Sequence, residues 1–201
     1  MSTFWDIWAP VYDLAEKTNG RAYADMLKTV REHVPQGASV LEAAAGTGSI
    51  SLAIADKASL VLCTDLSARM LNVARRKVEK SGARTITIDT RSVFDLREPD
   101  SSYDVVVASQ VLHLIDEPEK AASELRRVAK TLVILPMSMT KNLRGKARFL
   151  LALYRLVGFS PKREFDADGY TTFLQTIGFD NCEHIHIPGK MPMVVAIWRK
   201  G

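Results

Sequence analysis

The fold is decided by one short stretch, Val40-Leu41-Glu42-Ala43-Ala44-Ala45-Gly46-Thr47-Gly48. Its first residues are apolar and predict a buried strand, and its small residues predict a tight turn where the backbone can approach a ligand closely. The helix expected next favours negative charge at its N-terminus, yet Glu42 stands directly ahead of the glycines. Because like charges repel, this loop disfavours a pyrophosphate and favours a nucleoside ligand that carries a positive amino-acid group. Ser51 also stands where the dinucleotide-binding pattern requires a third glycine or alanine.

A second acidic residue, Asp65, ends the next apolar run, 17 residues beyond Gly48. In a doubly wound fold, an acidic side chain at this place accepts hydrogen bonds from both ribose hydroxyls. Two alternatives stay open, because Asp65-Leu66-Ser67 also resembles a helix N-cap, and close packing alone explains small residues at a strand–helix turn. The loop and the two carboxylates together favour the ligand interpretation.

From about residue 37, short apolar runs alternate with helical stretches. The patterns predict strands at 40–42, 60–64, 85–88, 103–108 and 131–135, and helices at 49–57, 68–80 and 118–129. Strands that are apolar on both faces predict a parallel sheet between two helical layers. With right-handed crossovers, this is a doubly wound, Rossmann-like α/β fold.

The two ends of the chain follow other patterns. Residues 1–36 predict a helical N-terminal cap, and residues 137–180 predict a helical insertion with helices at 143–157 and 167–177. Strands at 182–187 and 193–198 are joined by the turn Pro188-Gly189-Lys190, which demands antiparallel pairing. We therefore expect residues 1–201 to form one domain whose sheet ends in an antiparallel hairpin.

Composition excludes several classes of protein. Of 201 residues, 47% are apolar and 25% are charged, which is incompatible with disorder or a disulfide-rich scaffold. The longest apolar run has six residues, whereas a membrane span needs about 20, so stable membrane insertion is not expected. Cys63 and Cys182 form no CxxC pair and are expected to be reduced core thiols, and the N-terminus lacks the features of a signal peptide. These features predict a cytoplasmic protein.

The quoted stretch resembles the first motif of the class I S-adenosylmethionine-dependent methyltransferases. Thr64-Asp65-Leu66-Ser67, followed by Met70-Leu71, is similar to the second motif, and residues 102–107 and 111–113 resemble the region of the fourth strand. Trp5 to Asp13 is similar to the opening of the ubiquinone/menaquinone-type subgroup. The resemblance implies S-adenosylmethionine as cofactor, S-adenosylhomocysteine as product and a small molecule as acceptor.

The resemblance also implies roles for single residues. Asp65 would bind the ribose hydroxyls, Leu66 and Met70 would lie against the adenine, and Tyr12 would cover the cofactor. The other cofactor-binding positions implied are Glu42, Ala43, Gly46, Thr47 and Gly48 in the first loop, Ser92 and Val93 after the third strand, and Ser109 and Gln110 after the fourth. This chain departs from the family pattern at Ala44, where a glycine is usual, and at Ser92, where an adenine-binding aspartate is common.

Methyl transfer from a sulfonium is a direct displacement, so the enzyme mainly aligns the reactants. A base is needed only where the acceptor must lose a proton, and His113, just past the fourth strand, is the best candidate. Asp13 is a weaker candidate base. His184 and His186 share one face of a strand, but no suitable third ligand lies nearby in sequence, so no metal site is expected.

The acceptor stays open. A phospholipid or other membrane lipid is one alternative, and a non-catalytic S-adenosylmethionine-binding protein is another, whereas a nucleic-acid substrate is disfavoured. From Lys141 to Arg163 there are seven Lys or Arg and no acid, which is compatible with a lid over an apolar substrate, a helix on an anionic membrane, or a helix packed on the sheet. Trp5, Trp8 and Tyr12 are spaced as core residues or as a lid, although Pro10 would interrupt their helix.

Overall fold

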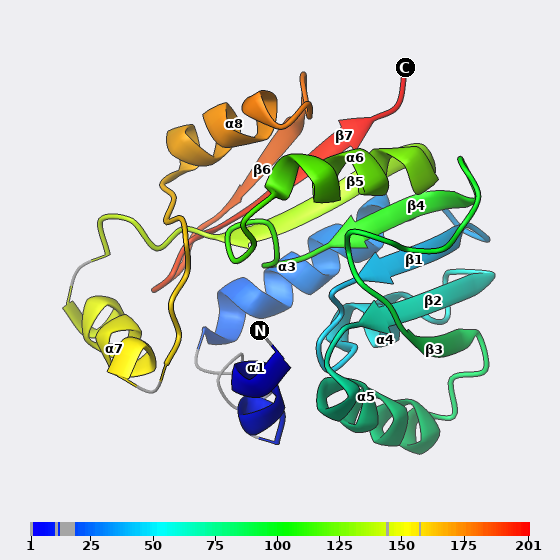
Figure 1. Ribbon diagram of the computed structural model, residues 1–201, viewed down its shortest axis with the longest axis horizontal. Coiled ribbons are helices and arrows are strands. Elements are labelled where there is room, and N and C mark those ends of the chain that lie inside the picture. The colour runs from blue at the N-terminus through cyan, green and yellow to red at the C-terminus, as the bar shows by residue number, and fades with distance from the viewer. Residues whose placement is uncertain (1, 11, 13–18, 144, 157) are drawn as a thin grey trace.

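A seven-stranded sheet forms the centre of the computed structural model, which describes residues 2–10, 12, 19–143, 145–156 and 158–201 (Figure 1). The strand order is β3-β2-β1-β4-β5-β7-β6. The strands are β1 (Ser39–Ala43), β2 (Leu60–Asp65), β3 (Ile86–Thr90), β4 (Tyr103–Ala108), β5 (Ala129–Ser138), β6 (Glu183–Ile187) and β7 (Met193–Arg199).

The first five strands are parallel, and β7 lies antiparallel between β5 and β6. This confirms both the doubly wound sheet and the antiparallel hairpin. Strand order reverses between β1 and β4, which pair from Val40 opposite Val105 to Ala43 opposite Ala108. In such sheets, ligands bind outside the carboxyl ends of the strands at this reversal.

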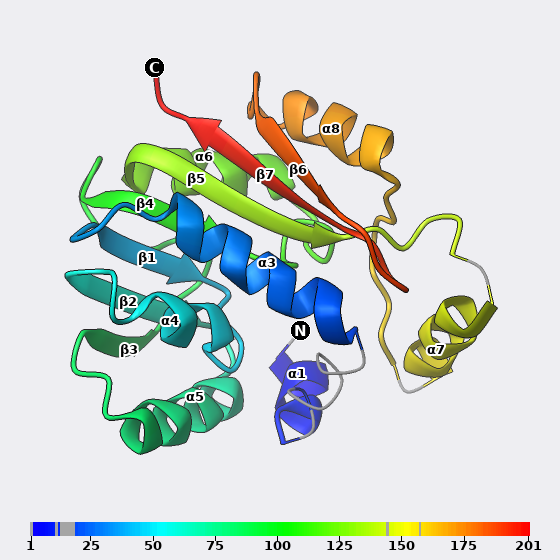
Figure 2. The ribbon, with the colours of Figure 1, turned by 180° about the vertical axis from the view of Figure 1, so that it is seen from behind.

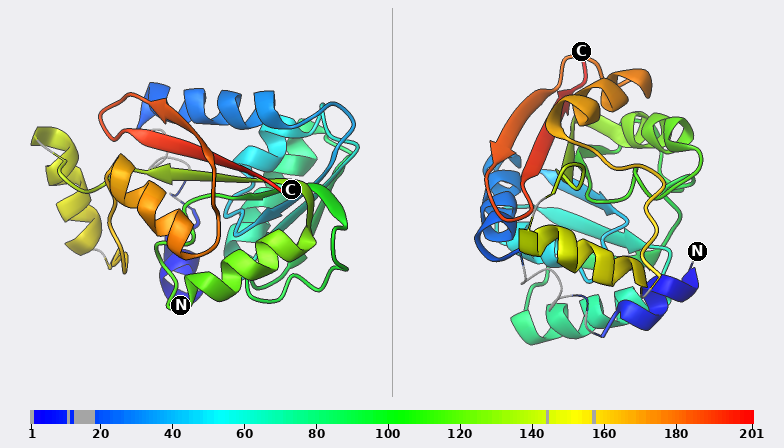
Figure 3. Two further views of the ribbon diagram at one scale, coloured as in Figure 1. Left: turned by 90° about the horizontal axis from the view of Figure 1, so that it is seen from above. Right: turned by 90° about the vertical axis from the view of Figure 1, so that its left-hand side faces the viewer.

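Helices cover both faces of the sheet, as predicted (Figures 1, 2 and 3). On one face, α6 (Pro118–Val128) and α8 (Ala167–Thr176) build a core from residues such as Leu125 and Leu174. On the other, α3 (Gly20–His33) and α4 (Ser49–Ile54) bury Met26, Val30 and Ile54. The remaining helices are α1 (Ser2–Trp8), α5 (Ala68–Ser81) and α7 (Gly145–Leu156).

Several boundaries differ from the sequence prediction. The helix expected at 49–57 ends at Ile54, and the strand expected at 131–135 extends from Ala129 to Ser138. Ala129 is at once the C-cap of α6 and the first residue of β5, so helix and strand join without a loop. Helix α1 ends at Trp8, two residues before Pro10, so its residues and Tyr12 do not form one continuous helix.

The two helices of the insertion lie in different places, and the two cysteines differ in burial. Helix α7 stands away from the sheet at one end of the molecule and is not packed on it (Figures 1 and 3). Both cysteines are free thiols, but only Cys63 is a core residue, because Cys182 is half-buried. In the described parts of the chain, every helix is too short or too polar to cross a bilayer.

Candidate functional site

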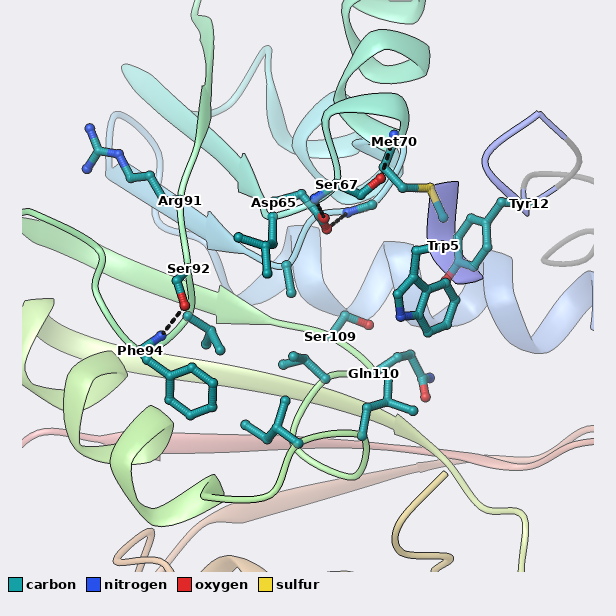
Figure 4. Close-up of a pocket in the computed structure, with 17 residues that line it drawn as sticks. Trp5, Tyr12, Asp65, Ser67, Met70, Arg91, Ser92, Phe94, Ser109 and Gln110 are labelled. Atoms are coloured by element: carbon teal, nitrogen blue, oxygen red, sulfur yellow. Dashed lines mark hydrogen bonds between the residues drawn. The ribbon is translucent and has the colours of Figure 1, made fainter. Parts of the chain in front are cut away.

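A cavity opens at the carboxyl ends of the parallel strands, where the strand order reverses (Figure 4). Its walls come from the N-terminal region and from the segments that follow β1, β2, β3 and β4. The lining residues are Trp5, Tyr12, Ala44, Gly46, Asp65, Leu66, Ser67, Met70, Arg91, Ser92, Val93, Phe94, Ser109, Gln110, Val111, Leu114 and Ile115. Most of the positions predicted to bind a cofactor therefore meet in one place.

The Asp65 carboxylate joins two sides of this cavity. One oxygen accepts a hydrogen bond from the Gly46 backbone N–H at 2.8 Å, and the other accepts one from the Ser67 N–H at 2.8 Å. Burial raises the pKa of Asp65, while the N–H groups of Ser67, Gly46 and Leu66 oppose that rise. Each carboxylate oxygen has a second lone pair, so both retain the capacity to accept a hydrogen bond from a hydroxyl group.

The N-cap of α5 is Ser67, not Asp65. The Ser67 hydroxyl accepts a hydrogen bond from the Met70 N–H at 3.1 Å and donates one to the Asp6 carboxylate of α1. The capping role that the sequence left open for Asp65 thus belongs to its neighbour two residues on. The Asp65 side chain is directed to the loop after β1 and to the cavity (Figure 4).

The two glycines of the first loop have different functions, although both have positive φ. A Cβ on Gly46 would face the cavity, with the Tyr12 ring 3.8 Å away. A Cβ on Gly48 would instead meet the Ala74 Cβ at 3.2 Å and the Cys63 sulfur at 3.5 Å. Gly48 therefore allows α5 to pack closely against the loop, and it does not line the cavity.

Glu42, Ala43 and Thr47 also lie outside the cavity lining. The buried Glu42 carboxylate accepts hydrogen bonds from the Ser51 N–H at 2.8 Å and from the Ser51 hydroxyl. Ser51, which breaks the dinucleotide pattern, is thus the partner that fixes Glu42 beneath the loop. The Thr47 hydroxyl accepts a hydrogen bond from Lys77 at 3.2 Å. Cofactor contacts for these three residues and for Gly48 stay predictions.

Much of the cavity lining is apolar, and two of its apolar residues are open to solvent. Leu66 is 58% exposed and Phe94 is 43% exposed, and both line the cavity with Met70 and Val93. The sequence indicated Ser92 and Val93 but missed Phe94, because its neighbours carry no periodic signal. The Ser92 hydroxyl accepts a hydrogen bond from the Phe94 N–H at 3.2 Å, which shapes this turn (Figure 4).

The end of β4 is fixed by Gln110, whose φ is 53°. Its side-chain amide donates to the Ser138 hydroxyl at 2.9 Å and accepts from the Ser138 N–H at 3.1 Å. These bonds join the ends of β4 and β5 and hold Ser109 and Gln110 at the cavity wall, beside the apolar Val111.

Aromatic residues from distant segments meet at the opening. Trp5 and Tyr12 line the cavity, with their ring centroids 6.0 Å apart, whereas Trp8 does not line it. Phe159 contacts Trp5 with centroids 6.3 Å apart. None of the described residues of the insertion is among the lining residues of this cavity, and Phe159 contacts the lining residue Trp5, so a function of the insertion in shaping the acceptor pocket stays a prediction. Asp13 lies outside the described residues.

His113 is buried behind the lining. Its ring centroid lies 6.4 Å from that of Phe159, and Nδ1 has no hydrogen-bond partner in the described chain. Burial lowers the pKa of His113 to about 4, so the imidazole is neutral at pH 7. His184 and His186 lie on β6, away from this cavity, and the described residues hold no group of three or more His, Cys, Asp or Glu placed to bind a metal.

Comparison with known proteins shows which family of enzymes this sequence is similar to. Residues 40–131 match a family model described as a methyltransferase domain. A phosphatidylethanolamine N-methyltransferase from Cereibacter sphaeroides is 35% identical over 127 residues, which are 61% of this chain and 59% of the relative. A ubiquinone/menaquinone biosynthesis C-methyltransferase from Burkholderia mallei is 30% identical over 151 residues, 72% of this chain and 62% of the relative. The chain thus spans about three fifths of the length of these relatives.

Solved structures share the fold. Magnesium protoporphyrin IX methyltransferase from Synechocystis PCC 6803, solved with bound SAH, superposes with a TM-score of 0.67 at 21% identity. The match covers 90% of this chain and 85% of that protein. At this identity, the likeness concerns the fold.

The packing function of Gly48 predicts the result of a matched pair of variants. Gly48→Ala and Gly82→Ala both place a Cβ at positive φ, but the Cβ at position 82 meets open space. We expect Gly48→Ala to lower the free energy of unfolding by at least about 1 kcal/mol more than Gly82→Ala, because of overpacking. Urea denaturation measures both, and equal losses would show that Ala74 and Cys63 yield without cost.

The burial of His113 predicts a pH dependence of stability. An unfolded histidine titrates near 6.5, whereas the buried one takes up its proton only at about pH 4. Its neutral form therefore contributes stability that is present above pH 6.5 and is lost as the pH falls toward 4, by about 3 kcal/mol in total. His113→Leu should lack this component in urea unfolding at a series of pH values, whereas replacing the exposed His186 should not remove it. Parallel curves for wild type and His113→Leu would contradict the assignment.

Proposed function

Because this chain belongs to the class I S-adenosylmethionine-dependent methyltransferases, we propose that it transfers a methyl group from S-adenosylmethionine to a small-molecule acceptor. The observation that carries the proposal is the Asp65 carboxylate, placed at the end of β2, tied to the Gly46 amide and exposed to the cavity. The products are the methylated acceptor and S-adenosylhomocysteine.

The residues present fit this cofactor chemically. Two carboxylate oxygens with spare lone pairs suit the two hydroxyls of a ribose. The apolar lining residues Leu66, Met70 and Phe94 suit contact with the flat faces of a base, and Leu66 and Phe94 are exposed to receive one. Gly46 leaves free the space that a side chain would take, and Ser109 and Gln110 supply polar groups at the far wall.

S-adenosylmethionine supplies a methyl group that its sulfonium charge already activates, so the remaining work is alignment and exclusion of water. Positioning of this kind provides roughly 7–11 kcal/mol of a barrier. The Gln110–Ser138 bonds fix one wall, and the Asp65–Gly46 bond fixes the loop opposite. Trp5 and Tyr12 line the cavity from the N-terminal region, which supports a covering function over the bound cofactor.

His113 is our candidate general base. It is neutral at pH 7 because burial lowers its pKa to about 4, and its Nδ1 has no other partner in the described chain. A base with so low a pKa has little driving force to take up a proton. It therefore suits an acceptor that gives up its proton readily, such as an amine whose nitrogen becomes more acidic as it is methylated.

The lining also constrains the acceptor. The lining also includes the apolar residues Val111, Leu114, Ile115 and Trp5, which favours an acceptor with an apolar part. The relatives named above act, by their names, on a phospholipid and in quinone biosynthesis, so a lipid acceptor is the second candidate. We place the protein in the cytoplasm, because both cysteines are free thiols.

The first test is cofactor binding by Asp65→Ala, measured by calorimetry. Each lost hydrogen bond to a charged acceptor costs roughly 1.5–3 kcal/mol, so affinity for S-adenosylmethionine should fall at least about tenfold. Wild-type affinity should also weaken as the pH is lowered, starting at a higher pH than for an ordinary aspartate, because burial raises the pKa of Asp65.

A matched control separates binding from folding. The Asp104 carboxylate likewise accepts two hydrogen bonds, from the Ser39 N–H at 2.9 Å and from its hydroxyl at 2.8 Å, but at the opposite ends of the strands. Asp104→Ala should affect stability and leave cofactor affinity unchanged. Unchanged affinity in a folded Asp65→Ala variant would remove the ribose assignment.

The second test is turnover in an acceptor screen that detects S-adenosylhomocysteine. We expect His113→Ala to lower turnover about a hundredfold, the lower end of the range for loss of a general base, because its pKa lies far below the working pH. Cofactor affinity should hardly change, since His113 does not line the cavity. If turnover by His113→Ala stayed within twofold of wild type, His113 would have only a structural role. If the wild-type protein bound S-adenosylmethionine but methylated no acceptor in the screen, a non-catalytic binding protein would be favoured.

A further inference from the structure

Helix α7 has an exposed face that joins apolar and basic side chains. Phe149 is 74% exposed and Leu156 is 83% exposed, and these two positions lie seven residues apart on the same side of the helix. Successive helical residues are about 100° apart, which places Arg148, Ala152 and Arg155 within about 120° of them. All five are exposed, whereas Leu151, on another side of the helix, is buried.

Two of the three functions weighed for this segment do not fit its position. A helix packed on the sheet would bury its large apolar residues, yet α7 stands away from the sheet (Figures 1 and 3). A lid over the cavity would contribute lining residues, and none of the described residues of α7 lines it. An exposed apolar pair on a projecting helix needs another partner.

The charge around this helix selects the partner. From Lys141 to Arg163 there are seven basic residues and no acid. Acids outside that stretch pair with three of them, as Lys141 with Asp166, Arg155 with Glu164, and Lys162 with Asp116. The three acids of these described ion pairs do not balance the seven positive charges of the stretch, so the segment attracts an anionic surface.

We propose that the exposed face of α7 docks on an anionic lipid bilayer. Apolar side chains flanked by arginines on one face of a helix are suited to the boundary between headgroups and acyl chains. A bare polyanion such as a nucleic acid would use the charges but leave Phe149 and Leu156 in water. Because β5 runs parallel to β1 and β4, α7 follows the carboxyl end of β5, on the side of the sheet where the cavity opens. Docking of α7 therefore brings the carboxyl ends of these strands close to the membrane.

The test is sedimentation with vesicles of phosphatidylglycerol and phosphatidylcholine in equal parts, compared with phosphatidylcholine alone. We expect the full chain to sediment with the anionic vesicles at low salt and less at physiological ionic strength. Phe149→Ser with Leu156→Ser should lower partition at least tenfold or so, and Arg148→Glu should lower it roughly fivefold or more. These side chains are exposed, so the variants should stay folded.

Matched controls come from the amino ends of the parallel strands, opposite the cavity. Leu60, at the amino end of β2, is an exposed apolar residue, and Arg84, ahead of β3, is an exposed cation. Leu60→Ser and Arg84→Glu should keep wild-type partition. No sedimentation at low salt would overturn the proposal, and so would equal losses in the control and α7 variants, or binding to heparin without binding to vesicles. Because vesicle binding is measured without cofactor or acceptor, its outcome is independent of the methyl transfer proposed above.

Discussion

The hydrogen bonds accepted by the Asp65 carboxylate connect the two halves of the site. One oxygen holds the Gly46 amide, which belongs to the loop after β1, and the other holds the Ser67 amide at the start of α5. This one charged group therefore fixes the loop conformation and the start of α5, and it also lines the cavity. Its burial raises its pKa, so the fold keeps a carboxylate here against a desolvation cost that three backbone N–H groups only partly offset.

Residues around this centre divide into those that support it and those that face the cavity. Glu42 and Ser51 hold the base of the loop, and Gly48 lets α5 approach it. By contrast, the cavity is lined by Gly46, Leu66 and Phe94. The first loop therefore mixes residues that line the cavity with residues that pack beneath it, and a single glycine substitution reports on one or the other according to the direction in which its Cβ points.

Two peripheral segments, α1 and the region around α7, lie on the same side of the sheet as the cavity. Helix α1 is held by the Asp6–Ser67 hydrogen bond and brings Trp5 into the cavity lining, where it meets Phe159 from the segment that follows α7. Helix α7 lies beyond this contact, and its exposed face combines Phe149 and Leu156 with arginines. The same side of the sheet thus presents the cavity and the surface that we propose to bind lipid.

The sequence by itself determined the sheet, its parallel core and the position of Asp65, because periodicity and turn residues are local properties of the chain. It also indicated the antiparallel hairpin, since a short turn allows no other pairing. It did not place β7 between β5 and β6, nor did it reveal that Ser67 caps α5, that Phe94 lines the cavity or that Gly48 packs on Ala74. Each of these depends on contacts between residues distant in the chain. Tertiary structure alone decided them, because the direction of a side chain follows from how the elements pack. The exposure of α7 was likewise decided by tertiary structure, because an amphipathic pattern of this kind is compatible with a buried helix as well as with an exposed one.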